Sequence, residues 1–172
     1  TDWLNFDGSL AKILAIGDTY KGGKIFYIFQ LGDPGYVAGQ THGLIAATSD
    51  QSTGIQWYNG ANTTTGATGT VLGTGNNNTN TIVTSLGNGS YAAKLCADLV
   101  LGGFTDWYLP SRDELDKLWI NRNVVGINSN TPYWSSTEYD SSQSYIRTIN
   151  ANDASGTAYK YSTYRVRAVR SF

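Results

Sequence analysis

The sequence predicts an α+β domain in which strands lie on both sides of two helices near the middle of the chain. Three observations support this fold class. Residues 90–101 and 111–122 have apolar side chains at helical spacing, whereas the segments before and after them have strand-like patterns. A length of 172 residues suits one domain with a full core. No repeat of solenoid or propeller period is present, so the chain is not a repeat array.

A β-hairpin is expected over residues 24–47, after an apolar N-terminal segment (residues 1–17) that is either a short helix or a connector from an upstream stalk. Residues 24–29 form a nearly continuous apolar and aromatic run, which is typical of a buried strand. Gly-Asp-Pro-Gly at 32–35 predicts a turn, and residues 43–47 supply the partner strand.

Residues 60–80 are rich in Asn, Thr and Gly and predict a long polar surface loop, after a short strand or aromatic turn at residues 55–58. An alternative is that this loop faces a ligand or a neighbouring subunit. Asn and Thr oxygens bind hard cations, but the loop contains no carboxylate, which argues against a calcium site.

Two helices are expected next. Residues 90–101 place apolar side chains on one face, and Gly102-Gly103 provides a helix end. A short strand at 107–109 then stops at Pro110, which cannot donate to a sheet. Ser111 and Glu114 have the spacing of a capping box, so a helix should begin there and run to about residue 122. The apolar faces of the two helices consist of Ala92, Leu95, Cys96, Leu99 and Val100, and of Leu115, Leu118 and Trp119.

The C-terminal part of the chain is expected to consist of strands. Trp134 should lie in the core, with the hydroxyl groups of residues 135–137 bonding nearby backbone. Residues 144–149 alternate with the period of a half-exposed strand. Residues 164–172 are interpreted as one closing strand that gives the domain a basic edge.

Composition excludes several classes of function. The formal net charge is −1 and charged residues make up 15% of the chain, so the basic face that nucleic-acid binding requires is not expected. No apolar run is long enough to cross a membrane, so membrane insertion is not expected.

The single cysteine, Cys96, is interpreted as a small buried hydrophobe, and the single histidine, His42, as a structural or solvent-facing residue. We therefore expect no cofactor and no metal. The absence of methionine indicates an excised domain or a processed product.

Five segments carry a resemblance to a known family, whose members have the same motifs in the same order. The segments are IGDTYKGGKIFYI (16–28), HGLIAATSDQSTGIQW (42–57), AAKLCADLVLGGFTDWYLPSRDELDKL (92–118), YWSSTEY (133–139) and RVRAVRSF (165–172). On these residues the chain resembles the bacterial DUF1566 family, which includes the C-terminal domain of the Legionella collagen-like adhesin. The resemblance covers residues 16–172 and leaves 1–15 as a linker or the end of a stalk.

The resemblance implies a C-type-lectin-like fold, with small twisted antiparallel sheets, two mid-chain helices and a loop-rich face. Two departures limit what transfers. The EPN, QPD and WND tripeptides of calcium-dependent lectins are absent, so calcium-dependent sugar binding does not carry over. One cysteine cannot supply the catalytic pair of formylglycine-generating enzyme, which is expected to share the fold. Fold alone assigns no activity.

The resemblance implies a non-catalytic receptor-binding or adhesion domain at the C-terminal tip of an extracellular, cell-surface or phage tail fibre, often as a homotrimer. The expected partner is a surface glycan or a protein. The alternatives are a trimerising cap and a glycan-active enzyme that uses Glu138 and Asp140 as an acid/base pair. Aromatic and polar side chains near turns are the candidate ligand contacts: Trp57, Tyr58, Tyr139, Asp140, Gln143, Tyr145, Arg147, Asn152, Asp153 and Tyr159.

Overall fold

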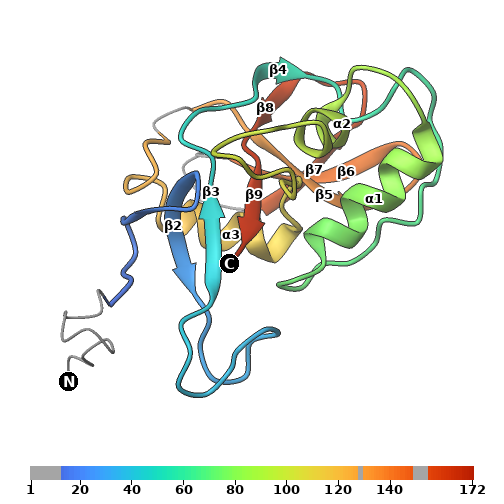
Figure 1. Ribbon diagram of the computed structural model, residues 1–172. Helices are drawn as coiled ribbons and strands as arrows, with labels where there is room; N and C mark the ends of the chain where they lie inside the picture. The colour runs from blue at the N-terminus through green and yellow to red at the C-terminus, as the bar shows by residue number, and fades with distance from the viewer. Residues whose placement is uncertain (1–12, 128–129, 149–154) are drawn as a thin grey trace.

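The computed structural model describes residues 13–127, 130–148 and 155–172, so most of the predicted linker at 1–15 lies outside the described residues. Two sheets and three helices make up this part of the chain, which confirms the α+β class (Figure 1). The four-stranded sheet has the order β1-β2-β3-β9 and the five-stranded sheet the order β4-β8-β5-β6-β7. The strands of the first sheet are β1 (Thr19–Tyr20), β2 (Gly23–Ile28), β3 (Gly43–Ala46) and β9 (Val169–Ser171). Those of the second are β4 (Ser52–Ile55), β8 (Tyr164–Val166), β5 (Tyr133–Glu138), β6 (Gln143–Arg147) and β7 (Ser155–Tyr159).

The predicted hairpin is confirmed, whereas the predicted closing strand is divided between the two sheets. Strands β2 and β3 pair antiparallel, with Ile25 opposite Ile45. The chain leaves β8 after Val166 and joins the other sheet at Val169. Between them, the N–H of Ala47 donates to the carbonyl of Ala168, so these residues connect the sheets and do not extend one strand. Strand β8 also pairs parallel with β5 at one position, so the expectation of purely antiparallel sheets is wrong.

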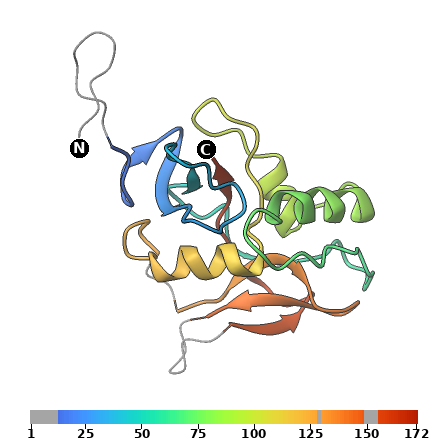
Figure 2. The same ribbon diagram turned by 90° about the horizontal axis from the view of Figure 1, so that it is seen from below.

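The helix α3 (Arg112–Ile120) begins at the predicted capping box, where Ser111 Oγ accepts from the N–H of Glu114 and the Glu114 carboxylate accepts from the N–H of Ser111. Its predicted apolar face is buried. Figure 2 shows α3 between the four-stranded sheet and the β6–β7 hairpin. The preceding helix α2 (Ala92–Ala97) is shorter than predicted. Val100, which was expected on its apolar face, lies beyond its end and is 68% exposed. Residues 101–104 form a tight turn closed by the Leu101–Phe104 bridge.

A third helix, α1 (Gly75–Leu86), begins inside the predicted polar loop of residues 60–80 and includes its last six residues. Two buried polar side chains of α1 explain why an Asn- and Thr-rich segment is helical here. Asn78 bonds the backbone N–H and C=O of Gly69, and Thr79 Oγ1 accepts from the N–H of Leu109. These bonds satisfy the buried side chains, so tertiary contacts override the weak helix propensity of the segment.

Two clusters of buried side chains form the core. The first lies around Trp57, Trp107 and Trp134 and contains Cys96, whose burial raises the pKa of the thiol. The second lies around Phe26 and Trp119. The expected core positions of Trp107, Trp119 and Trp134 and the expected burial of Cys96 are therefore confirmed. The predicted strand at 107–109 is reduced to a single bridge between Tyr108 and Val169.

The predicted basic edge is not formed, because the three C-terminal arginines are paired with carboxylates. Arg165 and Arg167 donate to opposite oxygens of Asp50, at 2.8 and 2.7 Å. Arg170 forms a bidentate pair with Asp106, and the bonded Arg170 guanidinium lowers the pKa of Asp106. The cationic groups therefore hold the sheets to their loops. Among the described residues, the helices are too short or too polar to span a bilayer.

Candidate ligand-binding face

The β6–β7 hairpin presents an aromatic surface because its side chains alternate between the core and the solvent. In β6, Ser144 and Ile146 are buried, so Gln143 and Tyr145 point the other way. The register places Gln143 opposite Tyr159 and Tyr145 opposite Thr157, so these four side chains share the outer face. The alternation predicted over residues 144–149 correctly placed Ile146 and Tyr145 on opposite faces of this strand.

Four tyrosines gather on this surface, which we call the tyrosine face: Tyr139, Tyr145, Tyr159 and Tyr161. Tyr139, Tyr159 and Tyr161 are 56%, 51% and 53% exposed. Tyr139 and Tyr145 meet edge to face at a centroid distance of 5.5 Å, whereas Tyr159 and Tyr161 stack at 5.2 Å with an interplanar angle of 7°. Such pairs hold aromatic rings in fixed positions while their outer surfaces stay accessible.

A buried ion pair lies directly behind the tyrosine face. Lys160 Nζ donates to Glu138 Oε1 at 2.5 Å and to the carbonyl oxygens of Thr63 and Ser141. Glu138 also accepts from the backbone N–H groups of Thr65 and Gly66. This network ties the polar loop before α1 to the end of β5 and to the open end of the β6–β7 hairpin. Sequence reasoning missed Lys160, because nothing local distinguishes a buried lysine from an exposed one.

Charged side chains border the tyrosine face, and each has an internal partner. The guanidinium of Arg112 lies 5.5 Å from the ring centroid of Tyr145 and bonds Asp113, whose carboxylate raises the pKa of Arg112. Arg147, a predicted contact, pairs with Asp116 of α3 at 3.4 Å and has 13% of its side chain exposed. It therefore stabilises the junction of β6 with α3, and little of it is accessible to a ligand.

The polar candidates Asp140 and Gln143 shape the turn between β5 and β6. Asp140 Oδ1 accepts from the N–H groups of Ser142 and Gln143, and these bonds lower the pKa of Asp140. The amide oxygen of Gln143 accepts from the hydroxyl of Thr157. Both side chains lie next to the exposed tyrosines, so the structure brings together Tyr139, Asp140, Gln143, Tyr145 and Tyr159 of the predicted set.

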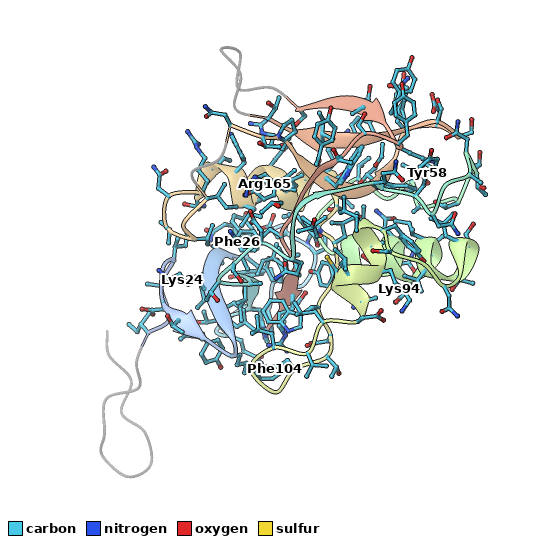
Figure 3. All side chains as sticks on the ribbon, turned by 90° about the horizontal axis from the view of Figure 1, so that it is seen from above. Lys24, Phe26, Tyr58, Lys94, Phe104 and Arg165 are labelled. Carbon is cyan, nitrogen blue, oxygen red and sulfur yellow. The ribbon has the colours of Figure 1, made fainter. Side chains whose placement is uncertain are left out.

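The other predicted contacts do not join this face. Trp57 is fully buried and donates from Nε1 to the carbonyl of Ser135, so its predicted role as a surface contact is wrong. Tyr58, labelled in Figure 3, is half-buried and packs against the first core cluster. Asn152 and Asp153 lie outside the described residues.

The structure gives the proposed acid/base pair a different role. Glu138 is buried and bonded to Lys160, whereas Asp140 lies at the exposed turn, so the two carboxylates do not converge on a common cleft. His42 bonds the carbonyl of Phe172 through Nδ1 and the side chain of Gln40 through Nε2. Within residues 13–127, 130–148 and 155–172, no three His, Cys, Asp or Glu side chains are grouped as metal ligands.

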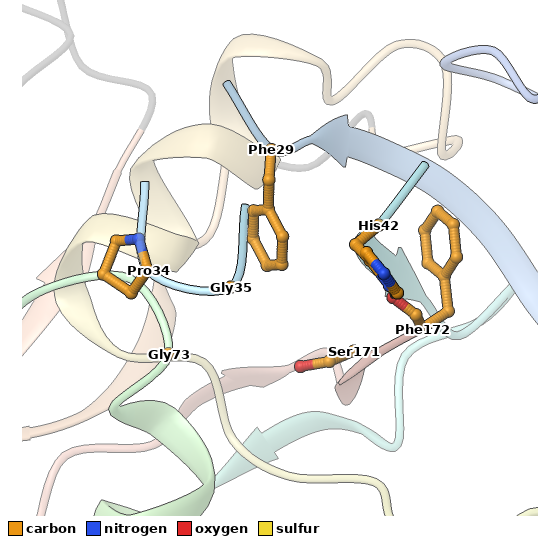
Figure 4. A pocket seen from close by; sticks show the side chains of 7 residues that line it. All are labelled: Phe29, Pro34, Gly35, His42, Gly73, Ser171 and Phe172. Atoms are coloured by element: carbon orange, nitrogen blue, oxygen red, sulfur yellow. The ribbon is translucent and has the colours of Figure 1, made fainter. Parts of the chain in front are cut away.

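A pocket that the sequence did not indicate lies where the β2–β3 loop meets the end of β9. The pocket has a volume of about 420 Å³ and is lined by the rings of Phe29, Phe172 and His42 together with Ser171 (Figure 4). Ser171 Oγ lies 3.2 Å from the hydroxyl of Tyr108, which in turn donates to buried Glu114. The walls of the pocket come from segments more than 100 residues apart, so no local sequence motif could reveal the pocket.

Comparisons with known proteins bear on the family and the fold. A family model described as Lcl C-terminal domain, formerly DUF1566, matches residues 46–170. The structure is similar to that of a fimbrial protein from Bacteroides ovatus ATCC 8483, with a TM-score of 0.56, 18% sequence identity and 98% of this chain covered. The chain spans about half of that protein, 48% of its length. No curated protein sequence matches the chain. At this identity the structural similarity establishes the fold alone.

Proposed function

This chain belongs to the Lcl C-terminal domain family, and from that premise we propose that it is a non-catalytic, adhesion-type recognition domain displayed at a cell surface. The fimbrial protein that shares its fold supports the same location. We further propose a C-type-lectin-like arrangement, in which the sheets and helices support one ligand-binding face. The tip of a fibre is one place where such a domain would act.

The exposed tyrosine face is the observation that carries the proposal. Large aromatic side chains are normally covered in a folded domain, and an exposed group of them marks an interaction site. Tyrosine suits recognition because it offers a broad apolar ring and a hydroxyl while losing little conformational entropy on binding. Asp140 and Gln143 beside the rings add directional hydrogen bonding. A surface glycan or a protein would meet this combination by stacking and hydrogen bonding.

A glycan array and a panel of intact cells, probed with the labelled domain, would test the proposal. We expect selective binding by the wild-type domain and at least a tenfold loss in the Tyr159→Ala/Tyr161→Ala double variant. Tyr36→Ala is the matched control, because Tyr36 is also exposed but lies in the β2–β3 loop. Its binding should equal that of the wild type.

Two results would contradict the proposal. Binding that is equally strong in the double variant and in the wild type would show that the binding site does not include Tyr159 and Tyr161. Absence of binding to glycans and cells, by a domain whose folding is verified by circular dichroism, would favour a fibre cap without a recognition role.

A further inference from the structure

Strand β7 is an edge of the five-stranded sheet, and no strand among the described residues lies beyond it. Figure 2 shows the β6–β7 hairpin at the margin of the domain. A Cβ placed on Gly156 would meet no atom within 4 Å. The face of the sheet toward which a side chain at position 156 would point is therefore open around β7 as well.

The backbone groups that β7 directs outward follow from its register. Lys160 N–H donates to the carbonyl of Ser142, and Gln143 lies opposite Tyr159. Because bonded and non-bonded pairs alternate in an antiparallel ladder, Ala158 and Gly156 bond β6, whereas Ser155, Thr157 and Tyr159 direct their N–H groups away from it. The carbonyl of Tyr159 already accepts from the N–H of Ser162, whereas the outward N–H groups and the carbonyls of Ser155 and Thr157 can pair with another strand.

β7 also lacks the features that normally protect an edge. Its sequence, Ser-Gly-Thr-Ala-Tyr, contains neither charge nor proline, and its pairing with β6 is regular over all five positions. The other edges differ. β1 has two residues, β9 has three, and the pairing of β4 contains a register shift. Among the described strands, β7 is therefore the edge suited to accept a partner.

We propose that β7 pairs with β7 of a second copy of this chain, antiparallel and about a two-fold axis at Thr157. This register is self-complementary, as a two-fold interface requires. It places Thr157 opposite Thr157 of the second copy, and Ser155 opposite Tyr159 of the second copy. The outward-facing N–H groups of each strand then find carbonyl partners, the carbonyl of Tyr159 being shared with the N–H of Ser162, and no like charges meet.

Side-chain positions fit this register. Ser155 bonds both Arg147 and Asp116, whose opposite charges offset each other. An uncharged side chain can therefore lie opposite Ser155 without leaving a charge unpaired. The tyrosine ring from the second copy would lie over Ser155 beside the Arg147 guanidinium, where a cation–π contact is favourable. The uncharged, small residues at the centre of β7 allow the two backbones to approach to the usual strand spacing of about 4.8 Å.

Sedimentation velocity from 10 µM to 1 mM, concentrations chosen for a weak dimer, tests the proposal. We expect the wild type to shift from one chain to two, and Thr157→Lys to remain a monomer, because two like charges would lie directly opposite each other. Thr157→Ser is the matched control, since it keeps the N–H and the hydroxyl, and should dimerise as the wild type does. Thr157→Pro removes an outward N–H only, a change that an edge strand tolerates, and should also abolish the dimer.

Three outcomes would overturn the proposal: a wild type that stays monomeric at 1 mM, a dimer that survives Thr157→Lys with the domain still folded, or a trimer. The oligomeric state is measured without ligand, so each of these outcomes is independent of whether the tyrosine face binds a glycan or a protein.

Discussion

The ammonium group of Lys160 lies 2.5 Å from Oε1 of Glu138, and both side chains are shielded from solvent. Successive side chains of an extended chain point to opposite sides. The inward orientation of Glu138 therefore turns Tyr139 outward, and the inward orientation of Lys160 turns Tyr159 outward. Tyr161, on the other side of Lys160, stacks on Tyr159. The exposed aromatic surface thus depends on a polar contact beneath it.

Lys160→Met should destabilise the domain by about 3–5 kcal/mol, because it leaves the buried carboxylate of Glu138 without its cationic partner. In the double variant Lys160→Met/Glu138→Leu the unpaired charge is gone, so the loss should be smaller than the sum of the two single losses. Urea unfolding of the wild type and the three variants measures this coupling.

Lys94→Met is the control for the ion pair. Lys94 pairs with Asp98 at i,i+4 on the surface, so its replacement should cost less than about 1 kcal/mol. Strictly additive losses for Lys160 and Glu138 would mean that the two side chains are not energetically coupled.

Glu114 should make stability depend on pH. Its burial raises the pKa of this carboxyl in the folded state, despite hydrogen bonds from Ser111 and Gly73 that favour the charged form. A raised folded-state pKa means that the stabilising contribution is complete below the unfolded-state pKa of about 4.3 and is lost as the pH rises through the folded-state pKa.

Glu114→Gln removes this titration while keeping a capping-box acceptor. The free energy of unfolding of Glu114→Gln relative to that of the wild type should therefore increase from pH 4 to pH 7. Urea unfolding at both pH values measures the difference. A constant or falling difference would contradict the raised pKa.

Trp107→Ala should cost about 3–5 kcal/mol, the range for removing a large buried aromatic side chain. Trp107 is buried in the first core cluster and donates from Nε1 to the carbonyl of Leu101. Thermal and urea unfolding measure the loss, with Val100→Ala as an exposed control that should stay within about 0.5 kcal/mol. Wild-type stability of the tryptophan variant would show that this ring is not part of the core.

The elements that the sequence predicted correctly are those specified by local chemistry. The capping box of Ser111 and Glu114, the hairpin around residues 32–35 and the alternation of β6 each depend on residues close in sequence. The outward orientation of Tyr145 followed from that alternation as well, whereas Tyr161 was not among the predicted contacts. These features need no knowledge of distant segments.

The missed elements depend on distant contacts. The Asn-rich sequence of α1 predicted a loop. The segment is helical because Asn78 bonds Gly69 and Thr79 bonds Leu109, two contacts that the local sequence does not reveal. The division of residues 164–172 into β8 and β9 reflects pairing with two different strands, β4 and β3, each of which lies more than 100 residues earlier in the chain. Trp57 is buried against β5, whereas its position beside a polar segment suggested exposure.

Gly75, the first residue of α1, gives a direct test of how tightly this helix packs against α3. A Cβ at Gly75 would lie 2.2 Å from Glu114 Oε2 and 2.8 Å from the backbone N of Ser111, so Gly75→Ala must displace the capping box. We expect a loss of about 1–3 kcal/mol, although alanine favours a helix over glycine. Gly156→Ala is the matched control, because its Cβ would meet no atom within 4 Å and should change stability little. If urea unfolding shows that Gly75→Ala is stabilising, the helix propensity of alanine outweighs the steric conflict, and the close approach of α1 to the start of α3 is not required by the fold.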